Sequence, residues 1–146
     1  MPRGNTMGKT QALATMLGLK GDIRSGLELL PHVRKGLPYR SIENVAKELE
    51  LTVDETAESI GLARRTMARR KTLRTLDPSE SERVVRLGSA LAFAADVLGS
   101  RAKARAWLVA PNRALGGVPP LSLLDTDIGS RAVEDVLVRI EHGVFS

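Results

Sequence analysis

The chain of 146 residues contains no cysteine and only two histidines. The absence of thiols excludes disulfides, thiol nucleophiles and thiolate metal ligands. The histidines, His32 and His142, lie far apart in the sequence, so a histidine-based zinc site is not expected. We therefore expect neither a metal nor a cofactor in this protein.

Aromatic residues and long apolar segments are also rare. With one Trp, one Tyr and two Phe, the core has to be built mainly from Leu, Val, Ile, Met and Ala, which favours helices over strands. No apolar run approaches the roughly 20 residues that a membrane-spanning helix needs. Residues 12–19 resemble a signal peptide only faintly, because a small-residue cleavage site is missing, and we expect a cytoplasmic protein.

The net charge of +5 is unevenly distributed along the chain. Residues 1–86 contain 16 Lys and Arg against 11 Asp and Glu, whereas residues 87–146 contain six of each. A basic first part and a neutral second part indicate an anionic partner for one and a protein partner for the other.

Apolar spacing predicts an all-α fold with no strand. Residues 1–21 show weak periodicity and are expected to form a frayed or partly helical arm. One helix then ends at Lys35 and Gly36, and Pro38 is expected to open the next helix in its first turn. Their expected buried residues are Ile23, Leu27, Leu30 and Val33 for the first helix, and Ile42, Val45, Ala46 and Leu49 for the second.

Residues suited to helix N-caps mark the later elements. Thr52 and Asp77 are each followed three residues later by Glu, which is the pattern of a capping box, and Ser100 is a third candidate cap. The predicted elements are helices at 53–60, 64–73, 78–98 and 101–108, a Pro- and Gly-rich loop at 111–120, and a final helix at 127–142.

Small and apolar residues within positions 53–70 have the spacing of a helix-turn-helix. Ala57 is small where two helices would cross, and Gly61 supplies a turn in the left-handed backbone region. Met67 adds a core contact, and apolar residues flank the glycine on both sides. One position departs from the pattern: Arg70 stands where a hydrophobic residue usually packs.

The second helix of this unit carries six cations in eleven residues, with no acid. Arg65 and Arg69 are one turn apart and are the best candidates for major-groove contacts, with Thr66 able to reach a base or a phosphate. A solvated basic face that binds nothing is the alternative, but it would not explain the helix-turn-helix spacing. The predicted DNA-binding set is Thr52, Arg64, Arg65, Thr66, Arg69, Arg70, Lys71 and Arg74.

The last third of the chain combines an aromatic at a helix end, Pro-Asn, a Gly-Gly-x-Pro-Pro turn and a final helix followed by His-Gly. These motifs lie at residues 107–112, 115–120, 123–129 and 140–146. The ordered set resembles the C-terminal toxin-binding domain of the Xre/MbcA/ParS antitoxin family. The helix-turn-helix segment resembles the variant Xre module of the same proteins, although Ala63 replaces an expected Ser cap. Together the resemblance covers about three-quarters of the chain.

We expect an N-terminal arm (1–21), which is longer than in the family, followed by a helix-turn-helix DNA-binding domain (22–76) and a toxin-binding domain (77–146) joined by a long helix. It implies an antitoxin that represses its own operon and covers the active site of a RES-domain toxin, an enzyme that depletes NAD. The residues expected to contact the toxin are Trp107, Pro111, Asn112, Leu115, Gly129, Glu141, His142, Gly143, Val144, Phe145 and Ser146.

Several of these residues have simpler interpretations. Taken alone, Trp107 is better explained as a core residue at a helix end, and Gly129 as a residue that allows close packing at a helix start. The tail 144–146 combines an aromatic ring with a carboxylate, the groups that could fill a NAD-binding cleft, but a frayed terminus explains it as well.

Two other functional classes compete with the antitoxin. A stand-alone dimeric helix-turn-helix regulator without a toxin partner is the main alternative. An enzyme is not expected, because no nucleophile lies at useful spacing from a base, and Asp125 and Asp127 are better explained as helix caps. Helix pairs of this size usually act as homodimers on a palindrome, with the small-residue surface 88–95 as a candidate seam.

Overall fold

The computed structural model describes residues 6–143, and over that range it contains α-helices, two short 3-10 helices and no strand. The all-α prediction is therefore confirmed. The elements are α1 Thr6–Met16, α2 Gly26–Lys35, α3 Arg40–Leu49, α4 Val53–Ser59, α5 Arg64–Leu73, α6 Pro78–Leu98, α7 Arg101–Val109, η1 Arg113–Leu115, η2 Pro120–Leu123 and α8 Asp127–Glu141.

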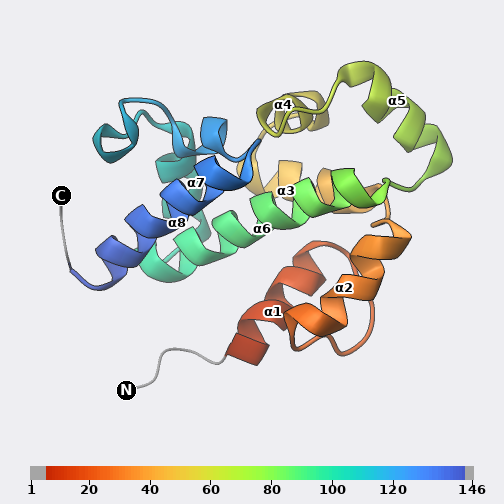
Figure 1. The fold of residues 1–146 in the computed structure, drawn as a ribbon, viewed down its shortest axis with the longest axis horizontal. Helices are drawn as coiled ribbons and strands as arrows, with labels where there is room; N and C mark the ends of the chain where they lie inside the picture. The colour runs from red at the N-terminus through yellow and green to blue at the C-terminus, as the bar shows by residue number, and fades with distance from the viewer. Residues whose placement is uncertain (1–5, 144–146) are drawn as a thin grey trace.

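Helix α6 is the spine of the molecule (Figure 1). It begins with the predicted capping box, in which the Asp77 side chain accepts a hydrogen bond from the Glu80 amide at 2.7 Å and Glu80 accepts one from the Asp77 amide at 3.0 Å. In Figure 1, α1 and α2 lie on one side of α6 and α8 on the other, while α5 projects near the start of α6. The core thus surrounds α6, and most other helices contact it.

Residues 1–21 were expected to form a frayed or partly helical arm; α1 is helical, but it packs against the core and does not extend away as an arm. Leu13 and Leu17 are buried, and they lie directly over Gly88 of α6, where an added Cβ would come within 2.9 Å of Leu13 Cδ1. The apolar periodicity of this helix is weak, so the sequence did not predict it clearly. Its position depends instead on close packing against Gly88, which is far away in the sequence. The same contact covers Gly88, so this part of the predicted dimer seam 88–95 is occupied within the chain.

Helix α2 begins later than the apolar spacing predicted. Ser25 caps it by accepting a hydrogen bond from the Glu28 amide at 3.2 Å. With this start, Leu29 faces the core and Leu27 is 81% exposed, so the predicted burial of Leu27 is wrong. Ile23 is buried as predicted, but from the segment before the helix.

Helix α3 begins at Arg40, and Pro38 lies before it in an isolated β-bridge with Thr75. The prediction that Pro38 belongs to the first turn of this helix is therefore wrong. Pairing with the segment after α5 holds Pro38 in an extended conformation. The predicted buried residues of α3 are confirmed: Ile42, Val45, Ala46 and Leu49 are all at most 2% exposed.

Candidate functional site

Helices α4 and α5 and the turn between them form the predicted helix-turn-helix. Gly61 adopts a φ of +76°, and the Leu62 amide donates a hydrogen bond to the Ala57 carbonyl at 2.8 Å. Ala57 and Met67 are both buried. The glycine is required because this region of backbone conformation disfavours side chains, and a Cβ there would also lie 3.0 Å from Arg83 Nη1.

The first helix of this unit has the predicted capping box. Thr52 Oγ1 accepts a hydrogen bond from the Glu55 amide at 3.0 Å, and Glu55 accepts one from the Thr52 amide at 2.9 Å. Hydrogen bonds from Thr52 lower the pKa of the Glu55 carboxyl below its ordinary value. Helix α5, by contrast, begins after Ala63 without a side-chain cap.

The exposed face of α5 is cationic. With 3.6 residues per turn, positions 65, 69 and 72 lie on the side of the helix opposite Met67, which points into the core. Arg65 and Arg69 are exposed on that side. Thr72 lies on the same side of the helix. It was not among the predicted DNA-binding residues, and only its helical spacing could have indicated it.

Of the other predicted DNA-binding side chains, Thr66 borders this face, whereas Arg64, Lys71 and Arg74 lie nearer to Met67 around the helix. Arg64 is 77% exposed and pairs with Asp54 of α4 at 3.5 Å. Lys71 is exposed and Thr66 half-buried. Arg74 ends α5 at a φ of +64°, and its guanidinium lies 5.9 Å from the centre of the Tyr39 ring.

Arg70 lies apart from the other cations. Its side chain is 17% exposed and forms an ion pair with Glu80, with Nε 2.6 Å from Oε1 and Nη2 3.1 Å from Oε2. A further bond of 3.3 Å joins Nη2 to Asp77 Oδ2. The bond to Glu80 raises the pKa of Arg70 above its ordinary value. Because it is engaged in this way, Arg70 is not part of the outward cationic face, and its departure from the apolar pattern is explained.

In the last third of the chain, Asn112 organises the loop between α7 and η2. Its Oδ1 accepts a hydrogen bond from the Ala114 amide at 3.0 Å, and its backbone is bonded to Val118 at 3.1 Å and Gly117 at 2.8 Å. The loop presents an exposed Pro111 between Val109 and Val118, which are 43% and 38% exposed.

Two further predicted toxin contacts, Trp107 and Leu115, are half-buried against the core. Gly129 is packed so closely that an added Cβ would overlap the Leu123 carbonyl, so close packing at the helix start is confirmed for this residue. Thr126 caps α8 by accepting a bond from the Gly129 amide at 3.0 Å. The expectation that Asp125 and Asp127 are the caps is therefore wrong.

The end of α8 carries the remaining predicted contacts. Glu141 is half-buried, His142 is the exposed C-cap residue, and Gly143 follows with a φ of +72°. Val144, Phe145 and Ser146 lie outside the described residues.

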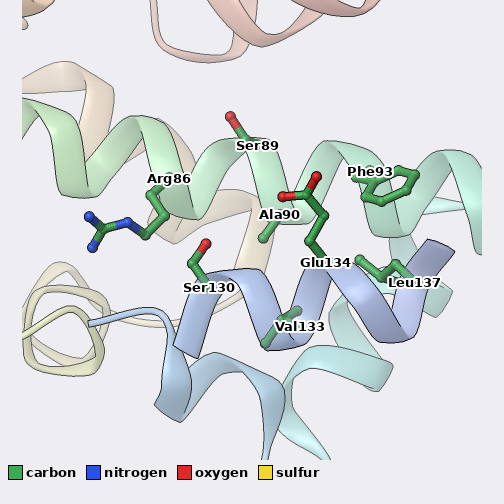
Figure 2. Close-up of a pocket in the computed structure, with 8 residues that line it drawn as sticks. All are labelled: Arg86, Ser89, Ala90, Phe93, Ser130, Val133, Glu134 and Leu137. Carbon is green, nitrogen blue, oxygen red and sulfur yellow. The ribbon is translucent and has the colours of Figure 1, made fainter. Parts of the chain in front are cut away.

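Helices α6 and α8 lie side by side and enclose a shallow groove of about 330 Å³ (Figure 2). Arg86 and Ser130 lie at one end and Phe93 and Leu137 at the other, which shows that the two helices run in the same direction. Arg86 donates a hydrogen bond to the Leu124 carbonyl at 3.3 Å. Most of the surface that lines the groove is apolar.

No group of three or more residues able to hold a metal ion occurs between residues 6 and 143. Within the same range, no helix is both long and apolar enough to cross a membrane.

Comparison with known proteins decides the family. The antitoxin Xre-like helix-turn-helix domain matches residues 28–88, and the antitoxin Xre/MbcA/ParS C-terminal toxin-binding domain matches residues 93–143. An "Antitoxin Xre" of Yersinia enterocolitica is 33% identical over 94% of the chain and 93% of its own length. The chain belongs to the Xre/MbcA/ParS antitoxin family.

Two other proteins with the same name agree with this assignment. The antitoxin Xre of Photorhabdus laumondii is 32% identical over 84% of each chain, and that of Pseudomonas putida is 28% identical over 84% of this chain and 76% of its own. The two domain matches, 28–88 and 93–143, both end or begin within α6. The antitoxin therefore carries a helix-turn-helix DNA-binding domain and a toxin-binding domain on one shared helix.

Proposed function

We propose that the chain neutralises a cognate RES-domain toxin, an enzyme that degrades NAD, by covering its active site, and that it represses its own operon as a homodimer. The observation that carries this proposal is the arrangement of two unlike surfaces on one spine. An outward cationic face on α5 suits DNA, and an apolar loop after α7 suits a protein partner.

The DNA-binding part rests on Arg65 and Arg69. They are one turn apart on the side of α5 that faces solvent, so both can enter the major groove together. Thr66 borders this face, Arg64, Lys71 and Arg74 are exposed cations elsewhere on α5 that can meet phosphates, and the N-cap Thr52 begins the preceding helix. Because a repressor must reach its operator DNA, we propose that the protein acts in the cytoplasm.

The toxin-binding part rests on the loop that Asn112 organises and on the end of α8. The exposed Val109, Pro111 and Val118 supply the apolar centre of a contact, whereas the half-buried Trp107 and Leu115 support the loop from beneath. Glu141, His142 and Gly143, at the end of α8, are the remaining residues that we propose for this contact.

The test is co-expression of the tagged chain with the product of its neighbouring gene, followed by purification and an NAD assay. We expect a stable complex that leaves NAD intact, and NAD loss once the antitoxin is stripped off under denaturing conditions and the toxin is refolded. A neighbouring protein that associates but never consumes NAD would contradict the RES assignment.

The alternative is a stand-alone dimeric helix-turn-helix regulator without a toxin partner. The cationic face of α5 favours it as much as the antitoxin, because that face needs no second protein. Promoter binding together with a complete failure to associate with the neighbouring gene product would favour this alternative.

A further inference from the structure

Helix α5 has few attachments to the rest of the molecule. Met67 is its only buried residue, and among the described helices α5 packs mainly against α4. At its end, the Arg74 carbonyl accepts a hydrogen bond from the Tyr39 amide at 3.0 Å. A helix held along one side by a single apolar residue can rotate about that contact unless another interaction prevents it.

Arg70 supplies such an interaction. It is close to Met67 around the helix, and it reaches across to the first turn of α6, where both residues of the capping box bind its guanidinium. Glu80 is only 6% exposed and is held by the Asp77 amide. The position of the Glu80 carboxylate is therefore held by contacts other than the one with Arg70.

The geometry of the pair is directional. Two guanidinium nitrogens bind two oxygens of one carboxylate, at 2.6 Å and 3.1 Å, and such paired bonds fix the plane of the guanidinium as well as its distance. An apolar side chain at this position would fill space without setting an angle. The ion pair therefore fixes the rotation of α5 relative to α6.

We propose that Arg70 is a positioning residue for DNA recognition, which acts through Glu80 and Asp77 to aim Arg65 and Arg69 at the major groove. The inference rests on the proposed operator binding. Arg65 and Arg69 lie on the opposite side of α5 from Met67, so a rotation of the helix about Met67 displaces both of them.

The test compares Arg70→Gln and Glu80→Gln in operator binding measured over a range of salt concentrations. We expect each variant to lose about tenfold in affinity for the operator, comparable to one lost base contact, with the salt dependence unchanged. The double variant should be no weaker than either single variant, because both remove the same interaction.

A direct phosphate contact by Arg70 predicts different results. Arg70→Gln would then lower the slope of log affinity against log salt by about one, and Glu80→Gln would leave binding equal or tighter, since it removes a negative charge. That pair of results would overturn the proposal. Arg70→Lys also distinguishes a positioning role from a phosphate contact. Lysine keeps the charge but cannot form the paired bonds to Glu80, so we expect this variant to weaken operator binding as well.

Glu55→Gln is the matched control. Glu55 occupies the same position of a capping box in α4, but no cation between residues 6 and 143 forms an ion pair with it, and Gln preserves the cap in both helices. We expect operator affinity to stay within about twofold of wild type. A loss equal to that of Glu80→Gln would show that weakened caps, and not the ion pair, change the binding, and would overturn the proposal.

A measurement without DNA keeps the ion pair testable if the protein binds no operator. Amide hydrogen exchange in residues 64–73 should accelerate in Arg70→Gln and Glu80→Gln but not in Glu55→Gln. Unchanged exchange in both would overturn the proposal. Wild-type protein that fails to bind promoter DNA would instead refute the proposed function, and the exchange result would still decide whether the pair holds α5.

Discussion

Helices α5 and α8 flank the two ends of the same spine, yet they are held in different ways. Three residues of α8, Val133, Val136 and Leu137, are buried, and the helix lies along α6. Helix α5 buries only Met67 and depends on polar contacts made by Arg70 and by the backbone at Arg74.

The difference agrees with the DNA-binding role that we propose for α5. A helix that enters a DNA groove has to keep most of its surface free, so few residues remain to anchor it. A helix that packs along the spine, as α8 does, can bury one full side. Substitutions in α5 are therefore expected to change binding, whereas substitutions on the inner side of α8 are expected to change the free energy of unfolding.

The largest effect is expected from Arg65→Ala combined with Arg69→Ala. Each arginine is expected to contribute about 1–3 kcal/mol to discrimination between bases, and the pair together about 2–6 kcal/mol. Sequence-specific retention of promoter DNA should be abolished in a gel-shift titration, while the melting temperature stays near that of wild type. Unchanged binding by the double variant would rule out this face as the DNA-reading surface.

Leu137→Ala is expected to have the next largest effect, and on stability. The Leu137 side chain is fully buried between α8 and α6, so its truncation should lower the free energy of unfolding by about 2–5 kcal/mol. Urea denaturation followed by circular dichroism measures this change. Leu73→Ala is the control in α5: because Leu73 is 57% exposed, its truncation should change stability by less than about 0.5 kcal/mol.

Gly129→Ala should destabilise the start of α8. The added methyl group would overlap the Leu123 carbonyl, and the required backbone shift should cost about 1–3 kcal/mol. Gly26→Ala is a matched control, because an added Cβ there meets nothing within 4 Å and Gly26 lies in a helix without a positive φ. Equal stability of Gly129→Ala and Gly26→Ala would show that α8 is less tightly seated than its buried residues indicate.

Thr52→Ala is expected to have the smallest effect of the four. It removes one cap bond of α4 and should lower the free energy of unfolding by about 0.5–2 kcal/mol. Thr52→Ser, which keeps the hydroxyl, should restore most of the loss in the same denaturation experiment. If serine behaves like alanine, the cap contributes little to holding the helix-turn-helix together.

The helix-turn-helix was predictable because its requirements are local. Gly61 is needed for a turn, Ala57 for a helix crossing, and both lie within a few residues of the contacts they serve. The capping boxes at Thr52 and Asp77 are local in the same sense, and both predictions are confirmed. The sequence therefore predicted the order of the helices from α3 onward.

Elements placed by distant contacts were not predictable. Helix α1 depends on Gly88, which follows it by some seventy positions in sequence, and nothing near α1 indicates that partner. The role of Arg70 depends on Glu80, which sequence analysis assigned only to a helix cap. A cation in a basic run gives no sign of whether it points toward solvent or toward a buried carboxylate.

One matched domain ends within α6 and the other begins there. A truncation of the chain within this helix therefore damages both domains. A stop codon between the two matched domains would remove the end of α6 together with α7 and α8, both of which pack against α6. The truncated product would not be a smaller repressor but an unstable chain. Mutations that abolish toxin binding while sparing operator binding should therefore be substitutions on the surface, and not truncations.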